Sequence, residues 1–252
     1  MSTEIQPRFA LITGGAGGID RTLVKVFNEA GYKIIATDRM PRPDNLLCTQ
    51  YIQSDLDRFA EDEAYAHEIL DSIRGGFKSN GLKVLINNAA LQILGGAERL
   101  TRRDWHQTLD INLLAPFLFT QALLPDLESA KGCVINISSI HARLTKKNFV
   151  AYATSKAALS GMTKALAVDL GSRVRVNAIE PAAIETEMLK DGFASKPELY
   201  CKLEGCHPQK RIGQPEEVAR LALAIVDGCM DFLHGACVGL DGGISSRLFD
   251  PD

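Results

Sequence analysis

The segment F-A-L-I-T-G-G-A-G-G-I-D (9–20) runs from a short apolar stretch into a turn rich in glycine. A strand that leads through such a turn into a helix lets backbone N–H groups approach a pyrophosphate, and the helix dipole favours negative charge there. The next apolar run ends at Asp38, twenty residues after Gly18. A carboxylate at this distance is expected to accept both hydroxyls of an adenosine ribose and to repel a 2′-phosphate. This favours NAD over NADP, although Arg39 could soften the rejection, and an ordinary strand-end residue is the alternative interpretation of Asp38.

Short apolar runs alternate with longer helical patterns along the 252 residues. The apolar runs suit parallel strands that are buried on both faces, and we expect them at 9–13, 32–37, 49–53, 82–87, 133–137, 174–179 and 236–240. Helices are expected between them at roughly 17–30, 58–74, 101–125, 149–170 and 215–227. The alternation predicts an α/β fold, a Rossmann-like doubly wound sheet of about seven parallel strands with helices on both faces. We expect one domain over residues 1–252, in which the irregular stretch at about 182–214 is a substrate lid.

The charge balance and the cysteines restrict the possible partners. The chain has 28 basic and 31 acidic residues and a net charge of −3, so no electrostatic feature predicts nucleic acid or a membrane surface as a partner. It lacks both a run of about eighteen apolar residues and an apolar signal core. The six cysteines form no C-x-x-C pair, which predicts reduced thiols in a cytoplasmic protein. A zinc site at Cys201, Cys206 and His207 is the alternative, but their spacing matches no common ligand pattern, so we expect no metal.

Tyr152 and Lys156 lie four residues apart in Y-A-T-S-K (152–156), thirteen residues downstream of Ser139 in N-I-S-S. On a helix such a pair shares one face. An ammonium group beside a phenol favours the ionised form and lowers the pKa of the phenol, so that Tyr152 can exchange a proton with a substrate oxygen near neutral pH. The Ser139 hydroxyl could hold the same oxygen. These three groups predict alcohol–ketone chemistry.

With these pieces in place, the chain resembles the short-chain dehydrogenase/reductase family across nearly its whole length. Each motif alone is common, but together and in order they are specific. The motifs are T-G-G-A-G-G-I (13–19), Asp55, N-N-A (87–89), Asn112 in D-I-N-L, Ser139 in I-S-S, Y-A-T-S-K (152–156), N-A-I-E-P (177–181), Thr186, P-E-E-V-A (215–219) and D-G-G (241–243).

The resemblance implies catalytic roles for Asn112, Ser139, Tyr152 and Lys156. Tyr152 would be the general acid/base and Lys156 would lower its pKa and bind the nicotinamide ribose. Ser139 would orient the substrate oxygen, and Asn112 would hold a water in a proton relay through Lys156. Asp55 and Leu56 would border the adenine, Asn88 would lie along the cofactor, and Ile184 and Thr186 would contact the carboxamide. The full set expected to bind NAD is Gly14, Gly17, Gly18, Ile19, Asp38, Asp55, Leu56, Asn88, Ala89, Tyr152, Lys156, Pro181, Ile184 and Thr186.

Three positions depart from the family pattern. Asp20 stands where the last glycine of the turn is usual, and its charge about 6 Å from a pyrophosphate would repel it by roughly 2–3 kcal/mol. That repulsion would weaken NAD binding about ten- to a hundredfold. Alternatively, Asp20 does not weaken NAD binding, because its negative charge interacts favourably with the helix dipole in the first turn and pairs with Arg21. Ala90 and Ala182 also replace glycines, which costs about 1 kcal/mol wherever the backbone needs a positive φ angle.

The substrate pocket is expected to draw on 91–97, on 140–147 and on the lid. His141 and Met188 are the candidate substrate contacts. Arg143, Lys146 and Lys147 suit an anionic or polyhydroxy substrate, although such charges also fit a solvated face. By analogy with the family, the helices at 101–125 and 149–170 would pair between subunits in a homo-tetramer or homo-dimer.

The leading hypothesis is an NAD(H)-dependent oxidoreductase that interconverts a small secondary alcohol and a ketone. One alternative is a binding or regulatory protein on the same fold with weak or no catalysis, which Asp20 favours. Another is an NADPH-dependent 3-oxoacyl carrier-protein reductase, against which Asp38 counts. An extended sugar-nucleotide epimerase fits less well, because such chains carry a larger C-terminal region.

Overall fold

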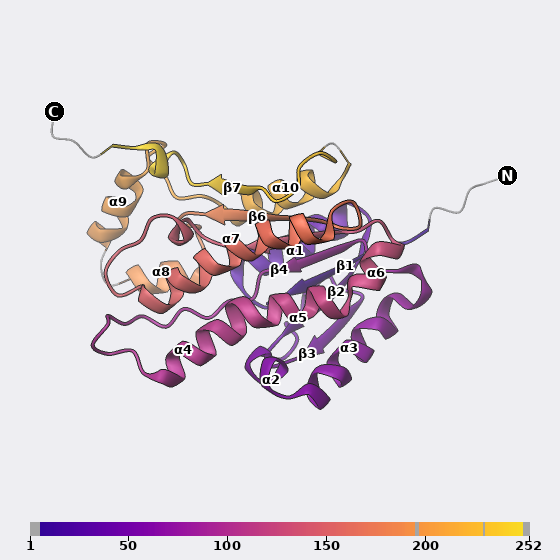
Figure 1. Ribbon diagram of the computed structural model, residues 1–252. Coiled ribbons are helices and arrows are strands. Elements are labelled where there is room, and N and C mark those ends of the chain that lie inside the picture. Colours follow the sequence, from indigo (N-terminus) through magenta and orange to yellow (C-terminus); the bar gives the residue numbers. More distant parts are fainter. Residues whose placement is uncertain (1–5, 195–196, 229, 249–252) are drawn as a thin grey trace.

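The computed structural model describes residues 6–194, 197–228 and 230–248. Its centre is a seven-stranded sheet whose paired strands are all parallel, in the order β3-β2-β1-β4-β5-β6-β7 (Figure 1). This order confirms the predicted doubly wound sheet, with the switch in direction between β1 and β4. The strands are β1 (Arg8–Thr13), β2 (Tyr32–Asp38), β3 (Gln50–Gln53), β4 (Val84–Asn87), β5 (Cys133–Ile137), β6 (Arg175–Pro181) and β7 (Cys237–Leu240).

Helices cover both faces of this sheet (Figure 1). One face carries α1 (Gly18–Glu29) and α10 (Pro215–Val226), whose apolar side chains form one core cluster with the strands. The opposite face carries α3 (Glu63–Phe77), α5 (Ala115–Ala122) and α7 (Val150–Leu170), which contribute to the second cluster. Strands β1, β5 and β6 are buried from both sides, as their nearly continuous apolar sequences predict, whereas the edge strands β3 and β7 are only partly buried.

Two predicted helices are interrupted in the structure. The stretch expected at 58–74 consists of α2 (Leu56–Glu61) and α3, because the backbone of Asp62 is extended and its side chain accepts the N–H of Tyr65 at 3.0 Å as the N-cap of α3. The stretch expected at 101–125 consists of α4 (Arg102–Leu109), a π-helical turn (Asp110–Leu114) and α5. A π-turn inside a helix is frequently a functional site, and this one contains Asn112.

The remaining short elements lie at the connections. Helix α6 (Leu124–Ser129) leads into β5, and three 3-10 turns lie at Lys78–Asn80, Ile140–Ala142 and Ile244–Ser246. In the described part of the chain, no helix has both the length and the apolar character needed to cross a membrane.

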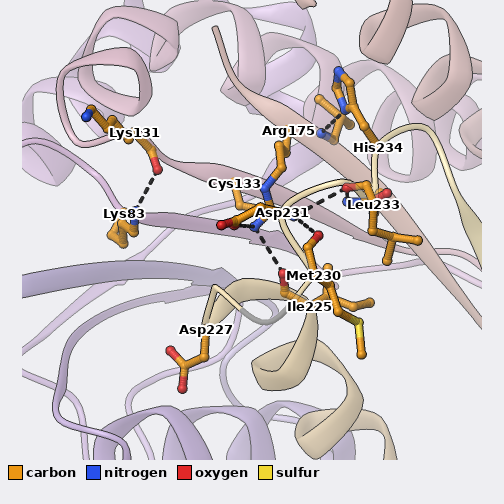
Figure 2. A network of polar contacts seen from close by, with 12 residues as sticks. Lys83, Lys131, Cys133, Arg175, Ile225, Asp227, Met230, Asp231, Leu233 and His234 are labelled. Carbon is orange, nitrogen blue, oxygen red and sulfur yellow. Dashed lines mark hydrogen bonds and ion pairs between the residues drawn. The ribbon is translucent and has the colours of Figure 1, made fainter. Parts of the chain in front are cut away.

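Arg175, the first residue of β6, makes polar contacts with the end of α10 and the segment that follows it (Figure 2). Its guanidinium donates to the carbonyl oxygens of Ile225 at 3.1 Å, Leu233 at 3.3 Å and Met230 at 3.4 Å. These bonds satisfy carbonyls at the end of α10 and in the turn that follows it. They anchor the segment between α10 and β7 at the edge opposite to the predicted site.

The connection between β6 and α10 contains the predicted lid. The sequence suggested an irregular stretch, whereas the structure forms α8 (Glu187–Phe193) and α9 (Pro197–Cys206) within it. The N-cap of α8 is Thr186, whose hydroxyl accepts the N–H of Leu189 at 3.2 Å. A bridge between Ile184 and Gly213 joins the two ends of the connection. The connection is therefore a two-helix excursion at the carboxyl ends of β6 and β7 (Figure 1).

Candidate active site

Ser139 and Tyr152 come together at the carboxyl end of β5. Ser139 follows this buried strand and starts the 3-10 turn at Ile140–Ala142, where its hydroxyl accepts the N–H of His141 at 3.2 Å. Tyr152 projects from the first turn of α7, and its phenol lies near enough to the Ser139 side chain for Ser139 to lower the pKa of the phenol. The structure therefore places the two hydroxyls so that both can contact one substrate oxygen.

Lys156 lies one helical turn beyond Tyr152 and is buried. Its Nζ donates to the carbonyl oxygen of Ile137 at 2.8 Å and lies 5.8 Å from the centroid of the Tyr152 ring. Burial lowers the pKa of Lys156 to about 7, because the charged form loses its hydration. Near neutral pH this amine can therefore exchange a proton.

The pKa of Tyr152 departs from the prediction made from the sequence. We expected Lys156 to lower it, but burial raises the pKa of Tyr152 above its ordinary value, and the hydrogen bond with Ser139 lowers it by less. The physical reason is that both partners are desolvated. Burial destabilises the Tyr152 phenolate just as it destabilises the Lys156 ammonium group. In the folded protein it therefore favours the uncharged form of each side chain.

Asn112 is buried in the π-helical turn, and its side chain forms hydrogen bonds with the backbone of the segment after β4. Its Oδ1 accepts the N–H of Leu91 at 2.7 Å, while its Nδ2 donates to the carbonyl of Leu91 at 2.8 Å and to the hydroxyl of Ser155 at 3.0 Å. Ser155 is the neighbour of Lys156 on α7. Asn112 thus joins three elements around the Ser139–Tyr152–Lys156 group.

The glycine turn between β1 and α1 packs tightly on the end of β4. Gly14 has a φ of +83°, and a Cβ there would lie 2.9 Å from the Cα of Ala89, so this position requires glycine. The N–H groups of Gly14 and Gly15 both donate to the carbonyl of Thr37, at 2.7 and 2.8 Å. Their N–H groups therefore connect the turn to β2.

The motif N-N-A after β4 is held by the end of β1. The hydroxyl of Thr13 accepts the N–H groups of Asn88 and Ala89 at 3.1 and 3.2 Å, and the Asn88 amide donates to the carbonyl of Thr13 at 3.3 Å. These bonds place Asn88 and Ala89 beside the glycine turn, on the edge of the sheet that also carries Ser139. Thr13 was not among the residues predicted to bind the cofactor, although it begins the glycine motif.

Asp38 closes β2 next to the same turn. Its Oδ2 accepts the N–H of Ala16 and its Oδ1 accepts the N–H of Met40, both at 2.9 Å. A carboxylate oxygen can accept more than one hydrogen bond, so Asp38 can still receive the two hydroxyls of a ribose. The geometry is compatible with the predicted role.

Asp20 lies at the third position of α1, and its side chain folds back onto the turn. Its Oδ2 accepts the N–H of Gly17, the N-cap residue, at 2.9 Å. Its Oδ1 is buried without a hydrogen-bond partner, and the residue is only 8% exposed. Arg21, which the sequence offered as an ion-pair partner, instead donates to the carbonyl of Ala16 at 3.2 Å.

The other predicted cofactor residues lie around this edge of the sheet. Gly18 and Ile19 begin α1, and a Cβ at Gly18 would lie 2.9 Å from the Cβ of Thr186, so the glycine turn is close to the start of α8. Asp55 caps α2, which begins at Leu56, by accepting the N–H of Asp57 at 3.0 Å. Pro181 ends β6, and Ile184 is buried next to it.

The two alanines that replace family glycines fit their positions. The non-glycine residues with positive φ angles in the described part of the chain are Lys78, Lys131, Asn148 and Lys210. Ala90 and Ala182 are not among them, so the strain considered from the sequence does not arise. The N–H of Ala182 donates to the carbonyl of Leu240 at 3.1 Å in an ordinary extension of the β6–β7 pairing.

An aromatic cluster borders the Tyr152 phenol. The ring of His141 stacks on Phe149 with 4.3 Å between centroids and meets Tyr152 edge-on at 5.8 Å. Burial, helped by the charge of Lys146, lowers the pKa of His141 to about 4, so this imidazole is neutral near pH 7. His141 thus lies next to the candidate catalytic tyrosine, whereas the side chain of Met188 lies outside the described part of the structure.

Arg143 and Glu180 form an ion pair that the sequence did not reveal. Glu180 is buried at the end of β6, and its carboxylate lies 2.7 Å from the Arg143 guanidinium. The other oxygen of Glu180 accepts the hydroxyl of Ser160 at 2.8 Å. A charged residue in a strand that otherwise reads as apolar was the available signal, because buried carboxylates need partners.

A cleft of about 390 Å³ lies in the connection between β6 and α10 rather than at Tyr152. It is lined by residues of this connection and of the start of α10, namely Glu185, Tyr200, Glu204, Arg211, Ile212, Gln214 and Glu217. Its charged groups are largely paired with one another, as in the bidentate contact of Arg211 with Glu217 at 2.7 Å. We therefore assign the cleft to the internal structure of the connection between β6 and α10.

The residues at this edge fit a nicotinamide dinucleotide at two of its three parts. Asp38 suits the adenosine ribose, and Tyr152 with Lys156 suits the reactive end. The third part, the pyrophosphate, would bind at the glycine turn. There the fit depends on Asp20, an acidic residue whose buried Oδ1 has no hydrogen-bond partner.

Comparisons with known proteins agree with this architecture. The family model described as enoyl-(acyl carrier protein) reductase matches residues 14–245. Protein FixR of Bradyrhizobium diazoefficiens is 32% identical over 249 residues, which is 94% of this chain and 87% of FixR.

Two solved structures are similar over almost their whole length. The ligand-free aldohexose dehydrogenase of Thermoplasma acidophilum superimposes with a TM-score of 0.90 at 26% identity, covering 98% of this chain and 97% of that one. ElxO with NADP bound gives a TM-score of 0.86 at 26% identity, covering 96% and 100%. Together with the family model, these likenesses show that the chain belongs to the short-chain dehydrogenase/reductase family of oxidoreductases.

Proposed function

We propose that this protein is an NAD(H)-dependent oxidoreductase that interconverts a secondary alcohol and a ketone. The observation that carries the proposal is the convergence of the Ser139 hydroxyl, the Tyr152 phenol and the Lys156 amine at the end of β5. The aldohexose dehydrogenase among the similar structures supports a hydroxyl group as the site of reaction. A nicotinamide dinucleotide would supply or accept the hydride.

The chain's own residues would hold the substrate oxygen and move its proton. In alcohol oxidation Ser139 donates a hydrogen bond to the substrate oxygen, and Tyr152 in its ionised form takes the hydroxyl proton. In the reverse direction Tyr152 returns that proton to the carbonyl oxygen. Lys156 stabilises the phenolate when it is protonated itself, and its pKa of about 7 lets it pass the proton onward. Asn112 holds the chain after β4 in place beside this group.

The preference for NAD rests on Asp38. Its carboxylate is held by the N–H groups of Ala16 and Met40 at the end of β2. In that position it accepts ribose hydroxyls and repels a 2′-phosphate, which disfavours NADP. The remaining predicted residues would complete the binding site as described above, with the lid at about 182–214 covering a small-molecule substrate.

We further propose a cytoplasmic homo-tetramer or homo-dimer. Support comes from Leu114 and Val150, which are apolar but exposed on the elements expected to pair between subunits.

A panel of alcohols and ketones, followed by NADH absorbance, tests the proposal. We expect turnover with at least one secondary alcohol or its ketone, and loss of that turnover by a factor of about 10³ or more in Tyr152→Phe. NADH binding, followed by its fluorescence, should be nearly unchanged in this variant. Tyr32→Phe is the matched control, because its hydroxyl contacts Asp227 and lies away from the site. Binding of NADH without turnover of any compound would instead favour a binding or regulatory protein.

A further inference from the structure

Two carboxylates of the chain occupy consecutive N–H groups of the glycine turn. The N–H of Ala16 donates to Asp38 Oδ2, and the N–H of Gly17 donates to Asp20 Oδ2, each at 2.9 Å. Asp38 is at the ribose position proposed above, and Asp20 is in the first turn of α1, a helix of 12 residues. A helix start of this kind attracts anions. Here the chain supplies its own anion before a ligand arrives.

Asp20 has the features of a group that takes up a proton. Its Oδ1 is buried without a partner in the described structure, and the residue is 8% exposed. Burial raises the pKa of Asp20 well above its usual range, the N–H of Gly17 lowers it, and the charge of Asp38 raises it further. A buried carboxylate with one unpaired oxygen is unfavourable, whereas a neutral carboxyl group gains a donor.

The surroundings of Asp20 strengthen this tendency. From β3, the phenol of Tyr51 has its pKa raised to about 12, first by burial and then by the charge of Asp38, so near neutral pH it stays uncharged and offers Asp20 no positive charge. The residues of α10 in the core cluster shared with α1 are apolar, among them Val218 and Ala222. The neighbouring cation, Arg21, is exposed and donates to the carbonyl of Ala16.

We propose, building on the function proposed above, that Asp20 is a pyrophosphate-binding residue that takes up one proton from solvent when the dinucleotide binds. The proton resides on Oδ1, which then donates a hydrogen bond to a phosphate oxygen. Oδ2 keeps its bond to the N–H of Gly17. The proton removes the repulsion between the carboxylate and the phosphates and gives the buried Oδ1 its missing partner. A glycine at this position could provide neither contact.

The consequence is a dependence of dinucleotide affinity on pH. Between the pKa of Asp20 in the free protein and its higher pKa in the complex, the dissociation constant rises tenfold for each unit of pH. In this range, binding takes up as much as one proton per site. Lys156 also titrates near neutral pH, so the contribution of Asp20 must be isolated with variants that leave Lys156 intact.

Calorimetric titration of the full chain with NADH tests the proposal. Titrations from about pH 6 to about pH 9 in two buffers of different ionisation enthalpy give the affinity and the number of protons taken up. Asp20→Asn keeps the acceptor for Gly17 and supplies a permanent neutral donor. We expect it to bind NADH at least tenfold more tightly than wild type at about pH 8 and to take up fewer protons, by as much as one per site.

Asp104→Asn is the matched control. Asp104 holds the same third position in α4 and closes the same kind of capping box, with the N–H of Thr101 donating to it at 2.8 Å. We expect its affinity for NADH and its proton uptake to equal those of wild type. Circular dichroism establishes that both variants fold, and a ¹³C carboxyl titration of wild-type protein with and without NADH reports the protonation of Asp20 directly.

The possible outcomes separate this inference from the function it rests on. Equal proton uptake in wild type and Asp20→Asn, or a carboxyl signal of Asp20 that does not move on NADH binding, would overturn the role of Asp20 alone. A failure of wild type and Asp20→Asn to bind NADH or NADPH at any pH would overturn both the role of Asp20 and the proposed function.

Discussion

The guanidinium of Arg143 lies 2.7 Å from the buried carboxylate of Glu180 and thereby ties the turn after Ser139 to the end of β6. Glu180 also accepts a hydrogen bond from the hydroxyl of Ser160. The Ser160 hydroxyl oxygen lies 2.9 Å from that of Ser138. Ser138 in turn donates to the carbonyl of Lys156 at 3.0 Å. The residues on either side of Tyr152 are thus joined by one continuous set of polar contacts.

Removal of the arginine is therefore expected to destabilise the protein. In Arg143→Ala the carboxylate of Glu180 loses its partner while it stays buried, which costs about 1–3 kcal/mol of unfolding free energy after allowance for the half-exposed arginine. Urea unfolding measures this change. In Arg143→Ala with Glu180→Gln, a neutral amide keeps the contact with Ser160 and should recover part of the loss. A double variant no more stable than the single variant would contradict this account.

The buried amine of Lys156 is expected to lower stability at neutral pH. Its pKa falls from about 10.4 in an unfolded chain to about 7 in the protein. A base with a depressed pKa in the folded state contributes stability above its unfolded pKa and loses it as the pH falls toward about 7. Lys156→Met removes this dependence and should abolish turnover.

Unfolding by urea at two pH values tests the sign. The stability gained in Lys156→Met should be greater at about pH 6.5 than at about pH 9, by about 2 kcal/mol. Lys164→Met, on the same helix but exposed, is the control and should show no such difference. A variant that gains equally at both pH values would show that Lys156 titrates normally.

The choice of cofactor is expected to change with Asp38. In Asp38→Ser the ribose hydroxyls lose a charged acceptor and the 2′-phosphate loses a repulsive neighbour. NADH affinity should fall about tenfold or more, and NADPH affinity should rise. The ratio of the two dissociation constants, from fluorescence titration, measures the shift. Arg39→Ala in the Asp38→Ser background should reduce the gain for NADPH, and an unchanged ratio in Asp38→Ser would place the ribose elsewhere.

The sequence predicted the sheet and the Ser139–Tyr152–Lys156 group because their signals are local. Each strand is a continuous apolar run, and Tyr152 and Lys156 lie on the same face of one helix. Helices α8 and α9 were missed because their sequence has no strong apolar periodicity. Asp62 and the π-helical turn around Asn112 interrupt helices at positions where the apolar pattern continues.

Contacts between distant segments could not be derived in this way. The Arg143–Glu180 ion pair joins a turn to a strand end, and only the fold brings these residues together. The raised pKa of Tyr152 follows from the burial of the whole group, which the spacing of Tyr152 and Lys156 does not reveal. Likewise, the sequence shows Asp20 at the glycine turn, but the direction of its side chain, with Oδ2 on Gly17 and Oδ1 unpartnered, is a property of the folded turn.

Asn112 is expected to affect stability and activity together, because its side chain serves the backbone of Leu91. In Asn112→Ala, the N–H and the carbonyl of Leu91 both lose their partner, which costs about 2–4 kcal/mol of unfolding free energy. The chain after β4 should loosen, and kcat should fall because Ser155, the neighbour of Lys156 on α7, loses its bond to Asn112. Asn80→Ala, whose amide donates to the carbonyl of Phe77 in a partly buried turn, is the control and should cost about 1 kcal/mol or less. If Asn112→Ala kept wild-type stability but lost turnover, Asn112 would act in the proton relay rather than as a support for Leu91.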